Sequence, residues 1–112
     1  MADDVSFHAL TSNEDLEEAL RQSGDEPVVL YKHSNTCPIS AQAQDELESL
    51  AGDGPPVYRV VVQEARPVSD QIAEHFSIRH ETPQAIVVRD GEPTFNASHR
   101  DVTAANVSQA AA

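Results

Sequence analysis

One segment of the sequence places a cysteine where its sulfur could act as a nucleophile. Cys37 follows a β-prone run and a polar turn, and Pro38 after it suits the first turn of a helix. Free backbone N–H groups and the helix dipole at such a position favour thiolate over thiol. Ser40 can donate a hydroxyl hydrogen bond back toward the sulfur. The pattern predicts a reactive thiol, against the alternative of an inert buried cysteine.

Several residues near this thiol could carry a positive charge or shape the site. Lys32 and His33 end the β-prone run, although strand geometry could point either of them away from the sulfur. For His33 we weigh a cation that favours the thiolate against a residue that only caps the loop. His80 precedes the dipeptide Thr82-Pro83 and is either part of the mouth of the site or a solvated loop residue.

Cys37 is the only cysteine of the chain. An internal disulfide is therefore impossible, and a zinc site built from cysteines cannot be assembled. Nothing in the sequence requires a metal, nucleotide or flavin, so we expect no bound cofactor. We also expect a monomer. A disulfide between two copies can form in vitro and should not be mistaken for an assembly.

The elements that must position these residues alternate along the chain. Apolar periodicity and end signals predict helices at 14–22 and 38–50, a helix opened by Pro67, and a last helix from about Asp101. Strands are predicted at 28–33, 57–63, 84–89 and 92–97, with Asp90-Gly91 as the turn between the last two.

The resulting order αβαβαββα predicts a single domain over residues 1–112, with residues 1–4 and 110–112 frayed. Alternating helices and strands predict parallel strands first, and the hairpin adds antiparallel ones. This is the layout of a thioredoxin-like α/β fold, with three α/β/α layers around a mixed four-stranded sheet. In that fold a pair such as Thr82-Pro83 precedes a strand, and its proline is cis and faces the reactive cysteine.

The motifs also resemble those of a known family, the monothiol bacilliredoxins of the YtxJ type. The resemblance runs in order from about Val28 to Val102. It rests on Lys32-His33-Ser34, Thr36-Cys37-Pro38-Ile39-Ser40, His80-Glu81-Thr82-Pro83-Gln84 and Ser98-His99. The family usually has an aromatic residue after the Ser-His pair, where this chain has Arg100.

The resemblance implies a cytoplasmic thiol–disulfide oxidoreductase that removes bacillithiol from mixed disulfides on client proteins. Cys37 would attack the bacillithiol sulfur and carry it until another thiol or a reductase system frees the enzyme. Ser40 in place of a resolving cysteine agrees with a one-thiol mechanism. We expect Pro38 and Ser40 to stabilise the thiolate, and we expect the substrate contacts to come from Thr36, Thr82 and Pro83.

Bacillithiol is the implied co-substrate, and its malate carboxylates require positive groups on an acidic protein. We expect these groups to come from Lys32, Arg66, Arg79 and His80. Three alternatives stay open from the sequence. They are a thioredoxin-like module that only binds a partner, an iron–sulfur carrier like the monothiol glutaredoxins, and, last, a thiol peroxidase or arsenate reductase relative.

The charge balance excludes several classes of partner. The chain has 19 acidic residues and 7 Lys and Arg, a formal net charge of −12. Nucleic acids and anionic membranes need clustered cations, so we expect neither as a partner. The first residues do not resemble a secretory signal, and no apolar run is long enough to span a membrane, which also favours a cytoplasmic protein.

The excess of acidic residues, with Lys32 as the single lysine, predicts a strong response to salt. Added salt screens repulsion between like charges, so the unfolding midpoint should rise steeply with ionic strength if the protein works in high salt. Thermal melts across a salt series measure this. A flat series would contradict an adaptation to high salt.

Overall fold

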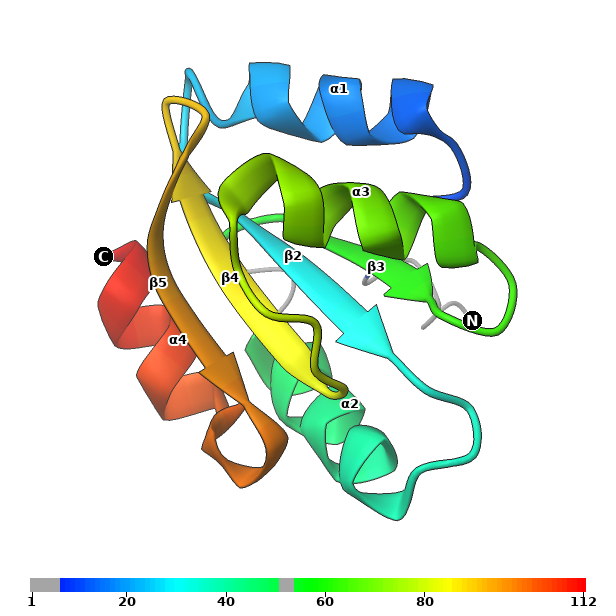
Figure 1. The fold of residues 1–112 in the computed structure, drawn as a ribbon. Helices are drawn as coiled ribbons and strands as arrows, with labels where there is room; N and C mark the ends of the chain where they lie inside the picture. The colour runs from blue at the N-terminus through cyan, green and yellow to red at the C-terminus, as the bar shows by residue number, and fades with distance from the viewer. Residues whose placement is uncertain (1–6, 51–53) are drawn as a thin grey trace.

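The computed structural model describes residues 7–50 and 54–112 (Figure 1). Residues 1–4, where we expect fraying, lie outside this part of the chain. The elements follow in the order β1 (Phe7–Ala9), α1 (Asn13–Gln22), β2 (Val28–His33), α2 (Pro38–Leu50), β3 (Val57–Val61), α3 (Arg66–Phe76), β4 (Gln84–Arg89), β5 (Glu92–Ser98), the 3-10 helix η2 (His99–Asp101) and α4 (Ala104–Ala111).

The sheet has five strands in the order β1-β3-β2-β4-β5, so the expectation of four strands is wrong by one. The additional strand, β1, has three residues and pairs in parallel with β3. Two of its residues are exposed, so it lacks the alternation of apolar residues that identifies a strand in sequence. The other pairings are as expected: β2 runs parallel to β3, and β4 is antiparallel to both β2 and β5.

Helices cover both faces of the sheet, which confirms the three-layer arrangement (Figure 1). All six residues of β2 are buried, as its continuous β-prone run predicts. Its alternate residues enter two separate cores. Leu30 packs in one core with residues of α1 and α3, and Val29 packs in the other with residues of α2 and α4.

Local interactions fix the ends of two elements. Ser12 caps α1, and its side chain accepts a hydrogen bond from the backbone N–H of Asp15 at 3.2 Å. Asp90 and Gly91 both have positive φ, 51° and 75°, as a tight turn between twisted antiparallel strands requires. The turn is tied to the end of α1, because the N–H of Asp90 donates to the carbonyl of Ser23 at 2.8 Å.

The last helix begins later than expected. A 3-10 turn occupies His99–Asp101, and α4 begins at Ala104 with Thr103 as its side-chain cap. Val107 is the buried residue of this helix. Arg89 Nη2 donates to the carbonyl of Ala111 at 2.9 Å, a contact that the sequence did not indicate, while fraying of residues 110–112 stays a prediction.

None of the helices in the described part of the chain has the length and apolar character needed to cross a membrane.

Candidate functional site

Cys37 lies where the sequence places it, between the carboxyl end of β2 and the first turn of α2. Its carbonyl accepts the first helical hydrogen bond, from the N–H of Ala41 at 3.2 Å, and its own N–H donates to the carbonyl of Ser34 at 3.4 Å. Pro38 begins the helix, where a missing N–H costs nothing. The thiol is half-buried, so it is held in place yet reachable from solvent.

The start of α2 stabilises the ionised sulfur. The backbone N–H of Ser40 is the main cause that lowers the pKa of Cys37, and the N–H of Ile39 and the Ser40 hydroxyl act in the same direction against partial burial. Ser40 is fully buried, and its Oγ also accepts a hydrogen bond from the N–H of Ser34 at 3.3 Å. The backbone at Ser40 therefore contributes more than the side chain that the sequence indicates.

Ser40→Ala should separate these two contributions. It keeps the backbone donor, so the pKa of Cys37 should rise only modestly while the thiol stays more acidic than an ordinary cysteine. The N–H of Ser34 loses its acceptor, so the free energy of unfolding should fall by about 1 kcal/mol. Thiolate absorbance against pH and chemical unfolding check both. Loss of the whole pKa depression would contradict the dominant role of the backbone.

A buried pair next to this turn was not predicted from the sequence. The hydroxyl of Tyr31 donates to the carbonyl of Ser40 at 2.9 Å and lies 2.8 Å from Nδ1 of His33. Because the hydroxyl has one hydrogen, Nδ1 of His33 must be the donor of the second bond. Burial is the main cause that lowers the pKa of His33, which favours the neutral, structural interpretation over a cation near the thiolate.

The turn before Cys37 is held by Gln63, a second residue that the sequence analysis missed. Its Oε1 accepts from the N–H of Asn35 at 3.0 Å, and its Nε2 donates to Ser34 Oγ at 2.9 Å. Gln63 follows β3, and β3 ends beside β2, so the carboxyl ends of adjacent parallel strands were the available signal. Thr36 is exposed at the edge of the site, with its Oγ1 at 3.4 Å from Gln63 Nε2.

Thr82-Pro83 is cis, as expected from the fold. It lies at the same edge of the sheet as Cys37, because Gln84 at the start of β4 is paired with Lys32 near the end of β2. Pro83 is buried and Thr82 is half-buried. The carbonyl of Pro83 accepts a hydrogen bond from the N–H of His99 at 2.8 Å, which brings the start of η2 to the site.

Lys32 and His80 come together, but inside the protein. Lys32 is 1% exposed and its Nζ lies 3.1 Å from Nδ1 of His80, with Ser69 Oγ 3.4 Å from the same nitrogen. Burial is the main cause that lowers the pKa of Lys32, to about 8. Burial, followed by the charge of Lys32, also lowers the pKa of His80, so a neutral His80 can accept from Nζ. The contact between Lys32 and His80 therefore links the end of β2 to the segment that precedes Pro83.

Gln84 belongs to the same buried region. Its Nε2 donates to the carbonyl of Arg79 at 2.9 Å, while its Oε1 is buried without a hydrogen-bond partner among the described residues. Within residues 7–50 and 54–112, no three His, Cys, Asp or Glu side chains are grouped so that they could hold a metal ion. The site presents one thiol of lowered pKa at the same edge of the sheet as the cis Thr82-Pro83 bond, and such a thiol can exchange with a disulfide.

The chain is similar to a family of known proteins and to solved structures. A family model described as "Monothiol bacilliredoxin BrxC" matches residues 8–107. A solved structure described as "A putative oxidoreductase with a thioredoxin fold" is 32% identical with a TM-score of 0.87, and the match covers 96% of this chain and 95% of the other.

Two more distant structures confirm the thioredoxin fold alone. A mutant thioredoxin from Halobacterium salinarum is 15% identical over 99% of this chain and 92% of its own, with a TM-score of 0.74. A Fasciola hepatica thioredoxin is 16% identical over 92% and 94%, with a TM-score of 0.73.

Proposed function

Because this chain belongs to the monothiol bacilliredoxin family, we propose that it removes bacillithiol from mixed disulfides on other proteins. Thiol redox chemistry agrees with its fold and with the oxidoreductase that it matches at 32% identity. One observation carries the proposal. The sole cysteine of the chain is half-buried at the start of α2, where backbone N–H groups lower its pKa.

The proposed exchange has two steps. The Cys37 thiolate attacks the bacillithiol sulfur of the client, the client disulfide breaks, and the client sulfur leaves as a thiolate that takes up a proton. Cys37 then carries bacillithiol in a mixed disulfide. The thiolate of a second bacillithiol attacks the carried sulfur, which gives oxidised bacillithiol and returns Cys37 as a thiolate.

The environment of Cys37 suits both steps. A lowered pKa raises the fraction of thiolate available for attack, and it also makes Cys37 a better leaving group when the second thiol arrives. No second cysteine can compete by closing an internal disulfide. Thr36, Thr82 and Pro83 are proposed to contact the substrate, and Pro38 with Ser40 to hold the thiolate.

We propose the co-substrate, the partners and the location of the protein from its membership of the family. The co-substrate is bacillithiol, the partners are bacillithiolated clients and a reductase system that reduces oxidised bacillithiol, and the enzyme acts as a cytoplasmic monomer. We propose no tightly bound cofactor and no nucleic-acid or membrane partner. The strongly acidic composition agrees with the last point.

Intact-mass analysis tests the proposal. Reduced protein is mixed with oxidised bacillithiol or oxidised glutathione, and a bacillithiolated client is then added to fresh reduced protein. A rapid adduct with bacillithiol, a slower one with glutathione, and release of the client thiol are the expected results. Protein blocked beforehand with iodoacetamide is the control. A folded protein that forms no adduct and releases no thiol would favour the partner-binding module instead.

A further inference from the structure

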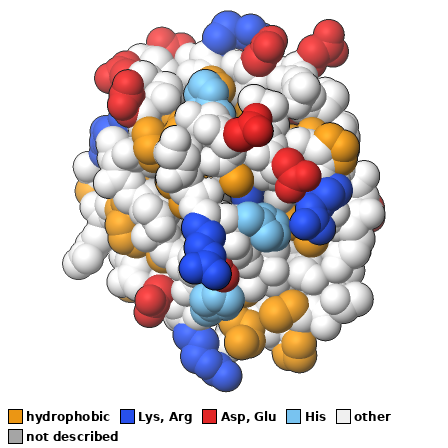
Figure 2. Space-filling model, viewed as in Figure 1, with side chains coloured by type: hydrophobic (Ala, Val, Ile, Leu, Met, Phe, Trp, Pro, Cys, Tyr) orange, Lys and Arg blue, Asp and Glu red, His pale blue; other side chains and the backbone are white. Residues whose placement is uncertain are grey.

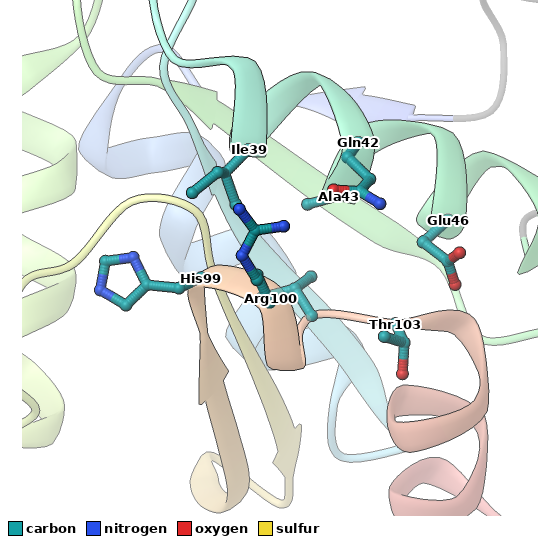
Figure 3. A pocket seen from close by; sticks show the side chains of 8 residues that line it. Ile39, Gln42, Ala43, Glu46, His99, Arg100 and Thr103 are labelled. Carbon is teal, nitrogen blue, oxygen red and sulfur yellow. The ribbon is translucent and has the colours of Figure 1, made fainter.

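A pocket of about 180 Å³ lies between the start of α2 and the η2 turn (Figure 3). Two of its lining residues connect it to the thiol site. Ile39 lines it two residues after Cys37, and His99 lines it while its N–H is bonded to the carbonyl of Pro83 at 2.8 Å. The other lining residues that matter here are Ala43, Glu46 and Arg100.

Arg100 supplies a guanidinium to this pocket. Figure 3 shows its side chain crossing the pocket toward Ile39 and Ala43, while the ring of His99 points away. Among the residues that the structure describes, the other five arginines each have a hydrogen-bond or ion-pair partner, and Arg100 has none. Those five are Arg21, Arg59, Arg66, Arg79 and Arg89.

Two of the carboxylates around the pocket, Glu46 and Glu81, have partners of their own. Glu46 Oε1 accepts from the backbone N–H of Ala104 at 2.8 Å, at the positive end of α4. Glu81 lies 3.0 Å from Nε2 of His99 and 3.6 Å from Nε of Arg79. Asp101 lines only the open hollow next to the pocket, at the surface. The guanidinium of Arg100 is therefore available to an anion from solution.

Positive and histidine side chains also gather in this region. In the lower half of the face in Figure 2, where Figure 1 shows η2 and the start of β4, Arg and His side chains lie close together. This contrasts with the net charge of −12 for the whole chain. A negatively charged ligand would meet less repulsion here than the composition implies.

We propose that Arg100 binds a carboxylate of the low-molecular-weight thiol while the sulfur of that thiol is bonded to Cys37. The proposal rests on the proposed function and adds the residue that recognises the co-substrate. A guanidinium suits this role because its planar donors match the two oxygens of a carboxylate. The pocket between α2 and η2 would hold the part of the thiol that links its sulfur to its carboxylate.

The positive groups that the sequence suggested for binding the carboxylates of bacillithiol have other partners in the structure. Lys32 is buried against His80. Arg66 lies 3.2 Å from Asp70, and Arg79 pairs with Glu81. In this proposal Arg100 binds the carboxylate in place of these residues. The η2 turn brings it to the site, because the N–H of His99 is bonded to the carbonyl of Pro83.

Rates of adduct formation on Cys37 test this role with Arg100→Gln and Arg21→Gln. Both variants lose one positive charge, but Arg21 lies in α1 and pairs with Glu18. The probes are oxidised bacillithiol, oxidised glutathione and oxidised glutathione with all its carboxylates esterified. Arg100→Gln should slow the two acidic probes about two- to fivefold, as for an exposed ion pair. It should leave the esterified probe unchanged, and Arg21→Gln should leave all three unchanged.

Equal slowing of acidic and esterified probes by Arg100→Gln, or no slowing of either, would overturn the role of Arg100. Failure of the proposed function has a different signature, because it shows in the unsubstituted protein. In that case no client is released from bacillithiol, whereas the dependence of the glutathione adduct on Arg100 can still be measured.

Discussion

Cys37→Ser should abolish bacillithiol adducts and reduce release of a client thiol to the uncatalysed rate. A serine hydroxyl is not ionised near neutral pH and cannot form a disulfide, and the chain has no other cysteine to substitute for it. The effect on activity is therefore all or none. Ser40→Ala, by contrast, should change the pKa of Cys37 only modestly, and Arg100→Gln should only slow adduct formation. Intact mass and a client-release assay measure it directly.

The fold should survive this change. Cys37 is half-buried and belongs to neither core, so its replacement by serine should alter the free energy of unfolding by no more than about 0.5 kcal/mol. Circular dichroism and a urea titration serve as controls. An adduct on the serine variant would show that the sulfur of Cys37 is not the reacting atom.

Lys32→Met should stabilise the protein at pH 7, by about 2 kcal/mol. The pKa of Lys32 is about 8 in the folded protein and 10.5 in its ordinary state, a difference worth about 3 kcal/mol against folding at neutral pH. Loss of the bond to His80 offsets about 1 kcal/mol of the gain. A methionine of similar length fills the space without a charge.

The sign of the pH dependence follows from these two values. Between pH 8 and 10.5 the unfolded chain still binds a proton at Lys32 and the folded protein does not, so stability from this group rises with pH. Below pH 8 Lys32 is protonated in both the folded and the unfolded state, so the free-energy cost of burying its charge is complete and does not change with pH. The advantage of Lys32→Met should accordingly shrink from pH 8 toward pH 10, as urea titrations at several pH values would show.

Leu30→Met is the matched control for this experiment. Leu30 is buried two residues earlier in β2, in the core between the sheet and helices α1 and α3. Its replacement should shift stability by an amount that does not vary with pH. A destabilised Lys32→Met variant at pH 7, or a gain that is the same at pH 7 and pH 10, would contradict the interpretation of Lys32 as a buried base that costs stability.

Most of the fold could be predicted because its signals are local. The β-prone run 28–33, the serine cap of α1 and the Asp90-Gly91 turn each specify their own conformation. The strand β1 could not be predicted in this way. Its three residues are held by pairing with β3, about fifty positions later in the chain, and two of them are exposed.

The candidate site likewise has parts that follow from local sequence signals and parts that depend on contacts between distant segments. Cys37, its place before a helix and the cis Thr82-Pro83 follow from residue types in sequence. The partners of Lys32 and the position of Arg100 depend on which strand lies beside which, and on a 3-10 turn that replaces the expected start of the last helix. The sequence left open whether Lys32 points toward the sulfur or away from it, and in the structure its Nζ lies beside His80 in the interior.

The contact of Arg89 with the last residues has a practical consequence. Strand β4 begins at the thiol edge with Gln84 and ends with Arg89, whose Nη2 donates to the carbonyls of Ala111 and Ala112 at 2.9 and 2.7 Å. Position 112 therefore lies at the opposite end of β4 from Cys37 (Figure 1). A linker attached there would immobilise the protein on a sensor chip with its reactive edge facing the solution.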